Sequence, residues 1–474
     1  MKADPPHSIK LWWFYAALML LGASFFYLLS YIPLYTISDV SKTSFIPISR
    51  IYRPKCVAHL ITFVKNTKGP LALAGGRYSQ GGQIGYPNGI TIDMTALNKV
   101  VAFDPVKKLI TVQAGMRWSA LQKYIDPYDL SVQIMQSYND FTIGGSLSVN
   151  VHGRDICCGP LIESVESIKV LLADGSIVHA SRIEHADLLN AIIGGYGGLG
   201  IIVEVTLRLT TNQVLERRVV RTSADQYAHH FLNTIRTDPS AVLHNANLYP
   251  PALNQVISIT WHTSDKAVTQ PERLQPQRSI YLSERLAEVL LRRIPFGRNV
   301  RASHAYKVLN KPAVHYRNYE MSSSVNTLGP LFRWPNTTIL QEYFIPVTHI
   351  AQFIDQLRNI TLRYHVHLLN VSLRYVPKNT ESLLTYSPND SFALVLYISI
   401  FNTYLGKIYT KRWTQELIDQ ALALGGTYYL PYQLYATPEQ LHTAYPEFDH
   451  FLQIKTKYDP ENKFSNMFFK TYGH

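Results

Sequence analysis

The stretch Thr142-Ile143-Gly144-Gly145-Ser146-Leu147-Ser148-Val149-Asn150-Val151-His152-Gly153 decides the fold predicted for this chain. Its paired glycines have no Cβ, so backbone N–H groups there can close on a bound polyanion. A histidine follows at a distance that can place a titratable ring beside whatever the glycines hold. The stretch therefore predicts a loop that binds an anionic ligand and carries a candidate acid or base.

A second glycine-rich loop, Leu73-Ala74-Gly75-Gly76-Arg77-Tyr78-Ser79-Gln80-Gly81-Gly82, lies upstream in a region with the pattern of a strand. A lone glycine pair is weak evidence for a ligand site, because Gly144-Gly145 by itself is also consistent with a tight turn. Two such loops in one region indicate a shared ligand.

The composition favours a large globular protein. The chain has 474 residues, of which 46% are hydrophobic and only 16% charged, so it can bury a large core and form two domains. The formal net charge is +12. Lys and Arg are dispersed without a basic and aromatic platform, which argues against nucleic acid. Anionic lipid or an acidic ligand is the better explanation of the charge.

The three cysteines, Cys56, Cys157 and Cys158, provide neither a disulfide framework nor a zinc-binding spacing, and no metal site is predicted. The adjacent pair is compatible with a strained vicinal bridge, but we expect buried free thiols without a part in function.

The N-terminal segment Leu11–Ser38 contains no charged residue and is long enough to cross a bilayer as a helix. Trp12 and Trp13 at one end, and Tyr31 and Tyr35 at the other, fit interfacial aromatic belts. A cleaved signal peptide is the alternative, but the length of the run favours an uncleaved single-pass membrane anchor. More Lys and Arg follow the segment than precede it, so we expect the large domain to face the cytoplasm.

Beyond this segment the pattern indicates an α+β protein. In the first half we expect strands at 71–74, 89–94, 109–114, 168–172, 177–180 and 200–209, and helices at 57–66, 118–124 and 187–193. In the second half we expect helices at 350–363 and 411–424, strands at 368–375 and 392–400, and a mobile excursion over 270–295.

Several motifs in order then resemble one family. Ala74–Ser79, Ile90–Met94, Val112–Gly115, Thr142–Gly153, Leu171–Ser176 and Gly197–Thr206 look like the FAD-binding domain of p-cresol methylhydroxylase (vanillyl-alcohol oxidase) type. The uncharged N-terminal run places a membrane anchor over 1–40. With the resemblance, we expect a two-part FAD-binding domain over 41–212, an α+β substrate (cap) domain over 213–440, and a segment over 441–474 that returns to the FAD domain.

The resemblance also implies which residues hold FAD. Gly75 to Ser79 would line the pyrophosphate, the second loop would contact flavin and ribityl, and the Ile202 backbone would contact the adenine side. The full implied set is Ala74, Gly75, Gly76, Arg77, Tyr78, Ser79, Ser137, Thr142, Gly144, Gly145, Val149, Asn150, His152 and Ile202.

Many family members tether the flavin through a histidine in a Gly-Gly-His-Ser pattern. Tyr78 takes that place here, and no cysteine lies near Ser137 to make a second tether. We therefore expect noncovalent FAD.

A further likeness is to the decaprenylphosphoryl-ribose oxidase group, which has His-Gly-Lys after the second loop where this chain has His152-Gly153-Arg154. That group also has a Tyr-x-x-Lys motif whose lysine lies beside the flavin and substrate. Tyr429 matches its tyrosine, but Tyr432 stands where the lysine is expected. This departure leaves the substrate open.

An enzyme of this family transfers hydride from an alcohol carbon to the flavin while another group accepts the hydroxyl proton. His152, Tyr429 and Tyr432 are the candidate catalytic residues. Histidine titrates near neutrality, whereas a tyrosine base needs a neighbouring cation such as Arg154 or Lys455. Each candidate has a structural alternative: a loop-holding hydrogen bond for the histidine, and aromatic packing for the tyrosines. Arg374 is a candidate for an acidic or polyhydroxy substrate, with a satisfied interdomain role as the alternative.

We therefore expect an FAD-dependent oxidoreductase that oxidises an alcohol of a sugar, a polyol or a lipid-linked sugar. The alternatives are an aldonolactone or alditol oxidase-like enzyme and a catalytically inactive flavin-binding membrane protein. The sequence does not identify the electron acceptor.

Overall fold

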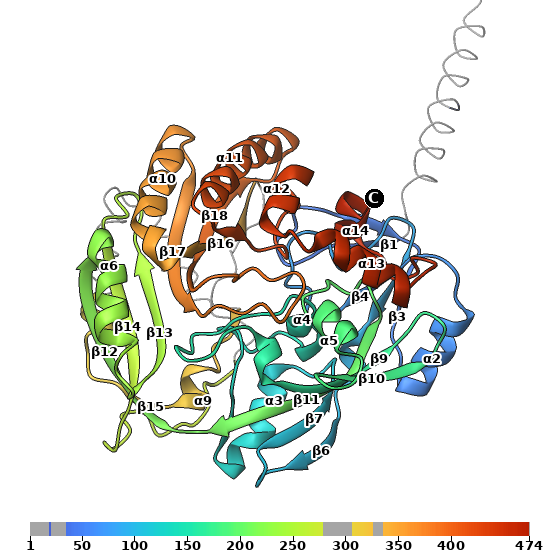
Figure 1. Ribbon diagram of the computed structural model, residues 1–474, viewed down its shortest axis with the longest axis horizontal. Coiled ribbons are helices and arrows are strands. Elements are labelled where there is room, and N and C mark those ends of the chain that lie inside the picture. The colour runs from blue at the N-terminus through green and yellow to red at the C-terminus, as the bar shows by residue number, and fades with distance from the viewer. Residues whose placement is uncertain (1–18, 20–34, 278–305, 326–334, 474) are drawn as a thin grey trace, which may run out of the picture.

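The computed structural model describes Met19 and residues 35–277, 306–325 and 335–473. The described chain is a mixed helix and sheet protein, which confirms the predicted α+β class (Figure 1). Among the described residues, the first half (35–211) forms three sheets and the second half (214–428) forms one large sheet, and the C-terminal helices lie against the first half.

The first half is built on a small parallel sheet and a larger antiparallel one. The parallel sheet has the order β3-β5-β4, and the antiparallel sheet has the order β10-β9-β11-β7-β6 with β8 paired to β11. The strands are β3 (Arg50–Tyr52), β4 (Leu71–Ala74), β5 (Ile90–Asp93), β6 (Val100–Asp104), β7 (Leu109–Gln113), β8 (Leu130–Val132), β9 (Val165–Leu171), β10 (Ile177–Ser181) and β11 (Ile201–Thr211). The helices are α2 (Val57–Asn66), α3 (Trp118–Ile125), α4 (Ile143–Ser148) and α5 (Ala186–Ile192).

The second half is dominated by an eight-stranded sheet of order β15-β12-β14-β13-β17-β18-β16-β19. Its strands are β12 (Val214–Ser223), β13 (Ala241–Leu248), β14 (Gln255–Thr263), β15 (Val314–Tyr316), β16 (Asn336–Pro346), β17 (His367–Val376), β18 (Ser391–Phe401) and β19 (Thr427–Tyr428). The helices are α6 (Ala224–His230), α9 (Arg317–Glu320), α10 (Ile350–Arg363) and α11 (Tyr404–Ala423). Figure 1 shows α6, α10 and α11 packed along this sheet.

This sheet has two chemically different faces because side chains alternate along each strand. On β17, Val371 and Leu373 are fully buried in the hydrophobic core, whereas Asn370 and Ser372 line a cavity. The apolar face is covered by helices, and the polar face is turned toward the first half of the chain.

The C-terminal segment packs against the first half. It contains α12 (Pro438–Ala444), α13 (Phe448–Tyr458) and α14 (Met467–Tyr472). Leu71 of β4 exchanges backbone hydrogen bonds with this segment, donating to the Lys463 carbonyl at 2.7 Å and accepting from Ser465 N–H at 3.1 Å. The edge of the parallel sheet is therefore completed by residues from the far end of the sequence.

The predicted elements agree closely with the observed ones where the apolar period is clear. The expected helices at 57–66 and 350–363 have the observed bounds of α2 and α10. Helix α11 begins at Tyr404 instead of Lys411, because Thr403 caps it by accepting a hydrogen bond from Gly406 N–H. Tyr404 and Leu405 in its first turn are apolar but exposed, so the sequence there does not show the apolar period of an amphipathic helix. The predicted excursion over 270–295 lies partly outside the described residues.

The predicted membrane anchor is not supported. Among the described residues, no helix combines the length and apolar character needed to cross a bilayer. Most of the expected span, 1–18 and 20–34, lies outside the described residues. Its end is a strand, since β1 (Tyr35–Ile37) pairs with β2 (Ile46–Ile48), and Tyr35, expected in an aromatic belt, lies opposite Ile48. The prediction of a single-pass membrane protein with a cytoplasmic-facing flavin domain is therefore wrong for the described part of the chain.

The expectation of buried thiols is also wrong. Cys56 and Cys157 are exposed and Cys158 is half-buried, and all three are free. Cys56 directly precedes α2, and Cys157 and Cys158 lie in a loop, where only Cys158 packs against the edge of the core.

Lys455 provides a test of the C-terminal attachment. The buried Lys455 ammonium donates to the Gly198 and Phe464 carbonyls at 2.6 and 2.9 Å and pairs with Asp459 at 3.0 Å. Lys455→Met leaves the Asp459 carboxylate buried without its cation, so we expect a loss of about 3–5 kcal/mol in the free energy of unfolding, measured by urea titration. Lys457→Met is the control, because the Lys457–Asp187 pair is largely exposed and its loss should have little effect. An equal effect of the two substitutions would contradict the proposed anchoring.

Candidate active site

A cavity of about 620 Å³ lies between the two halves of the chain. Its lining comes from the two glycine-rich loops, from the residues before and at the start of β11, and from the polar face of the eight-stranded sheet. The segment Tyr429–Tyr432, which follows β19, closes one side. The cavity therefore joins residues that are more than 350 positions apart in sequence, such as Tyr78 and Tyr432.

The first loop offers backbone donors to this cavity. Strand β4 ends at Ala74, and the N–H groups of Gly76 to Ser79 donate no hydrogen bond to an acceptor in the described chain. Arg77 has a φ of 63°, the left-handed conformation that turns successive N–H groups toward one side. Its guanidinium also lies 3.4 Å from the Asp93 carboxylate. This loop is suited to an anionic group such as a pyrophosphate.

The second loop has a different role from the one expected. Thr142 caps α4. Gly144 N–H donates a hydrogen bond to the Ala114 carbonyl at 2.7 Å, and Gly145 N–H donates to Thr142 Oγ1 at 3.3 Å. These two glycines therefore do not offer free donors to a phosphate. They are needed for close packing, since a Cβ on Gly144 would lie 2.9 Å from the Ala114 carbonyl oxygen.

The two loops contact each other directly. A Cβ on Gly75 would lie 2.1 Å from Thr142 Oγ1, a distance that no side chain tolerates. Tyr78 stacks on Phe141, with ring centroids 4.3 Å apart. Burial raises the pKa of the Tyr78 phenol above its ordinary value. The absence of side chains at the glycines thus lets both loops share one wall of the cavity.

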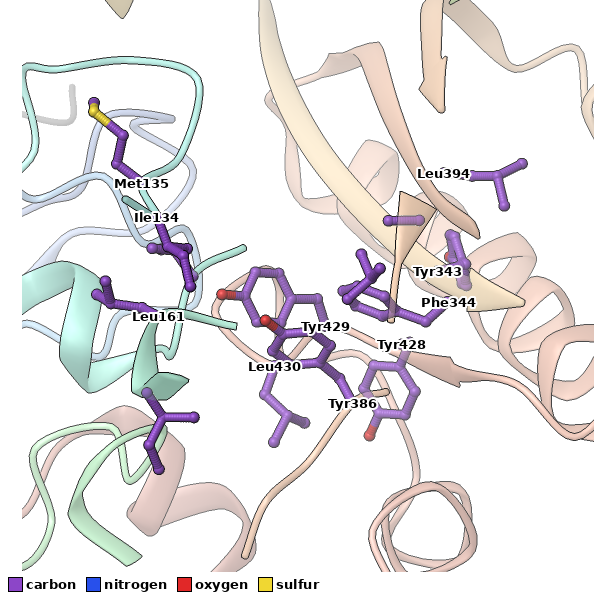
Figure 2. Close-up of a cluster of buried hydrophobic side chains, with 14 of the residues drawn as sticks. Ile134, Met135, Leu161, Tyr343, Phe344, Tyr386, Leu394, Tyr428, Tyr429 and Leu430 are labelled. Atoms are coloured by element: carbon purple, nitrogen blue, oxygen red, sulfur yellow. The ribbon is translucent and has the colours of Figure 1, made fainter. Parts of the chain in front are cut away.

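His152 lies at the junction of the two halves. Its side chain is only 4% exposed, and its Nε2 lies 2.7 Å from Glu342 Oε1 on β16. Its Nδ1 lies 3.4 Å from the Gly153 carbonyl oxygen. Figure 2 shows the neighbouring aromatic side chains, with Phe344, Tyr386 and Tyr429 close together. Phe344 and Tyr386 stack at a centroid distance of 4.2 Å.

The two candidate tyrosines are hydrogen-bond donors in this site. Tyr429 O–H donates to the Val149 carbonyl at 2.7 Å, and Tyr432 O–H donates to Glu342 Oε2 at 3.3 Å. Burial raises the pKa of both phenols well above the ordinary value, and the Glu342 carboxylate raises it further. Lys455 does not assist, because its ammonium is held by the C-terminal segment. The geometry therefore argues against either tyrosine as a base.

The opposite wall carries amides and guanidinium groups. Asn370 donates to the Asn247 amide oxygen at 3.3 Å. Arg154 donates to the Glu320 carbonyl at 2.6 Å, and burial lowers the pKa of its guanidinium. Arg374 makes no ion pair among the described residues, and its buried Nε has no hydrogen-bond partner there. This wall offers neutral donors and acceptors together with one arginine free to bind a ligand.

All but one of the predicted site residues line the cavity. The exception is Asn150, which is buried behind it and bonds to Ile162 N–H and the Tyr386 hydroxyl. Its φ of 48° shows that it shapes the loop. The cavity-lining members of the prediction are Ala74, Gly75, Gly76, Arg77, Tyr78, Ser79, Ser137, Thr142, Gly144, Gly145, Val149, His152, Ile202, Tyr429 and Tyr432.

The sequence prediction missed the polar residues contributed by the large sheet. Glu342 is the most important, because it contacts both His152 and Tyr432. The available signal was Glu342 as the one charged residue in the strand sequence of β16, where a buried carboxylate requires a partner. Other missed lining residues are Gln136, Asn245, Asn247, Asn370, Ser372 and Tyr397.

Comparisons with known proteins match both halves of this cavity. Residues 50–181 match an FAD binding domain, and residues 337–472 match a D-arabinono-1,4-lactone oxidase domain. Both glycine-rich loops lie in the first region, and Glu342, Arg374, Tyr429 and Tyr432 lie in the second.

Among similar proteins, decaprenylphosphoryl-β-D-ribose oxidase of Mycolicibacterium smegmatis is 24% identical over 84% of this chain and 88% of its own length. Mitochondrial L-galactono-1,4-lactone dehydrogenase of Arabidopsis thaliana is 28% identical over 49% of this chain. Mouse L-gulonolactone oxidase is 28% identical over 33% of this chain. The chain spans only 38% of the plant dehydrogenase and 36% of the mouse oxidase.

The fold and the site define a flavoprotein oxidoreductase. The chain combines an FAD-binding domain of p-cresol methylhydroxylase (vanillyl-alcohol oxidase) type over residues 50–181 with a region of D-arabinono-1,4-lactone oxidase type over residues 337–472. FAD is its cofactor. The unpaired N–H groups of Gly76 to Ser79 fit the pyrophosphate, and the cavity continues past Gly145 toward His152, which leaves space for the flavin ring.

Gly75→Ala tests the contact between the loops. The added methyl group would displace Thr142, and overpacking of this kind costs about 1–3 kcal/mol. We therefore expect FAD affinity to fall by roughly tenfold or more, measured by fluorescence titration of the flavin-free protein. Gly75→Ala combined with Thr142→Ala should bind FAD more tightly than Gly75→Ala alone, because the double variant relieves the clash. Full flavin occupancy in Gly75→Ala would contradict this role.

Proposed function

We propose that this protein binds FAD noncovalently and oxidises a CH–OH group of a sugar-derived, polyhydroxylated small molecule. One observation carries the proposal: a buried histidine faces a single cavity whose other walls are the FAD-binding loops and a polar face of the large sheet. The cavity therefore has room for the cofactor, a candidate proton acceptor and a hydroxyl-binding surface in one place.

Different residues are proposed to bind the substrate and to accept its proton. Asn245, Asn247, Asn370 and Ser372 project from neighbouring positions of β13 and β17 and present donors and acceptors to the hydroxyl groups of a substrate. Arg374 adds a positive charge with an unused Nε donor. A substrate held on this wall lies between the sheet and the cofactor loops.

In the reaction, the alcohol carbon becomes a carbonyl carbon as its C–H and O–H bonds break. FAD held by the two loops would supply the acceptor for the hydrogen that leaves the carbon as hydride. His152 receives the hydroxyl proton. The buried aromatic side chains Phe344, Tyr386 and Tyr429 exclude water from the histidine (Figure 2).

Two substrate classes fit this proposal. A lipid-linked sugar is favoured by the near full-length similarity to decaprenylphosphoryl-β-D-ribose oxidase. An aldonolactone is favoured by the D-arabinono-1,4-lactone oxidase match over the region that carries Glu342 and Arg374. The lactone reading is the second candidate, since the similarity to lactone dehydrogenases and oxidases covers a smaller share of the chain.

The first prediction from this proposal concerns the flavin. Purified protein should be yellow, and acid precipitation should release the flavin into the supernatant because Tyr78 occupies the position of the tethering histidine. Anaerobic absorption spectra should show bleaching on addition of decaprenylphosphoryl-β-D-ribose, D-arabinono-1,4-lactone or L-galactono-1,4-lactone. A preparation without flavin that cannot be reconstituted would overturn the cofactor assignment. Flavin that none of these compounds reduces would overturn the substrate assignment.

Arg374→Gln tests the binding wall. Removing a charged hydrogen-bond donor costs about 1.5–3 kcal/mol, so we expect the substrate dissociation constant to rise by roughly 10- to 100-fold. Stopped-flow reduction of the flavin at varied substrate concentration separates this constant from the limiting rate. Arg363→Gln is the control, because Arg363 is exposed and pairs with Glu416 outside the cavity. An unchanged dissociation constant with a reduced limiting rate would assign Arg374 to the chemical step instead.

A further inference from the structure

We infer that Glu342 is a positioning residue for His152, and that the two side chains act as one proton-accepting pair across the boundary between the two halves. This inference rests on the proposed function, because it specifies how the proposed proton acceptor is held. The sequence analysis predicted neither a role for Glu342 nor its contact with His152.

Glu342 is directed into the cavity by the alternation of β16. Its neighbour Gln341 points to the other face, where its amide donates to Thr414 of α11 at 2.8 Å. Glu342 therefore lies on the cavity face together with Leu340. Its side chain is 3% exposed, so the carboxylate depends on protein partners instead of water.

The pairing determines which nitrogen of His152 is basic. An ionised carboxylate only accepts hydrogen bonds, so the 2.7 Å contact assigns the proton of neutral His152 to Nε2. Nδ1 then keeps its lone pair. The Gly153 carbonyl oxygen lies 3.4 Å from Nδ1. It has no proton to donate to that lone pair, and it can accept a hydrogen bond from Nδ1–H once the imidazolium forms. Nδ1 is therefore the nitrogen available to receive a proton.

Glu342 is itself held by the segment after β19. Tyr429 N–H donates to the Glu342 carbonyl at 2.9 Å, and Tyr432 O–H donates to Oε2 at 3.3 Å. The Tyr432 phenol stays protonated, because burial and the Glu342 carboxylate raise its pKa well above the ordinary value. Tyr432 thus orients the carboxylate without neutralising its charge.

Tyr432 also explains how the carboxylate remains available to the histidine. The ribose oxidase group has a lysine at this position in its Tyr-x-x-Lys motif. An ammonium here would pair with Glu342 and compete with His152 for the carboxylate. The neutral Tyr432 phenol donates to Oε2 without forming an ion pair. The negative charge of Glu342 therefore stabilises the imidazolium that forms when His152 takes the hydroxyl proton.

Several other polar groups face the pair and contribute to its electrostatics. Arg154 adjoins it in sequence, Arg374 lies on β17, and Tyr386 and Tyr429 pack around the ring. The buried setting strengthens each of these interactions relative to water. The titratable and charged groups around His152 are Arg154, Glu342, Arg374, Tyr386, Tyr429 and Tyr432.

Glu342→Gln tests the inference while preserving shape. We expect the limiting rate of flavin reduction, with whichever lactone or ribose compound reduces the native protein, to fall roughly 10²- to 10³-fold, the range of a general-base contribution. The acid limb of its pH profile should move to lower pH, because the imidazolium loses its carboxylate. Glu342→Asp should keep that limb near its native position. An unchanged limb and rate in Glu342→Gln would overturn the inference.

Tyr343→Phe is the matched control, because Tyr343 lies on the opposite face of the same strand and bonds to Gln341. Tyr343→Phe should leave the acid limb of the pH profile at its native position, which would exclude a general disturbance of β16. His152→Gln should abolish the limb. If Glu342→Gln abolishes the limb and His152→Gln retains it, Glu342 is the base and the inference fails.

A readout without substrate separates this inference from the proposed function. The native flavoprotein should show a low-field proton resonance, assigned by its absence in His152→Gln, from the short Nε2–H···Glu342 hydrogen bond. Glu342→Gln should shift it upfield, toward the position of a neutral hydrogen bond. If no compound reduces the native protein but this resonance behaves as expected, the proposed function fails and the pairing stands. Absence of the resonance in the native protein would overturn the pairing.

Discussion

The close approach of Thr142 to Gly75 is the constraint on which the site depends. It brings two loops more than 60 residues apart into one wall, and only a residue without a side chain permits it at position 75. The approach also leaves the first loop's N–H groups free, since the second loop satisfies its own donors through Ala114 and Thr142. The two glycine pairs therefore have different tasks: the first exposes donors, and the second allows packing.

The second requirement is the meeting of that wall with the large sheet. His152 lies in the segment after α4, at the boundary between the two halves of the chain. Glu342 lies on β16 on the other side of that boundary and contacts His152. The contact is buried, with the two side chains only 4% and 3% exposed, so the imidazole and the carboxylate are each other's main partners. The same side chains thus hold the two halves together and supply the proposed chemistry. A change in their relative position would affect both.

The first half of the fold was predictable because its strands and helices carry clear apolar periods. The bounds of α2 follow from Leu60 and Val64 on one face. Strand β4 follows from a short apolar run flanked by glycines, and β11 follows from the alternation of apolar and polar residues. The predicted anchor shows the limit of this reasoning. An uncharged apolar run has the same composition whether it spans a bilayer or ends in a strand, and here Tyr35–Ile37 pairs with β2.

The sequence by itself determined the cofactor, because FAD contacts come from local motifs whose glycines and order are visible along the chain. Only the tertiary structure decided the partners of His152 and the acid–base character of Tyr432. Those properties depend on Glu342, which is 190 positions from His152 and reaches it only through the pairing of β16 with β18 and β19. A buried charge acts through distance in space, and no local pattern records that distance.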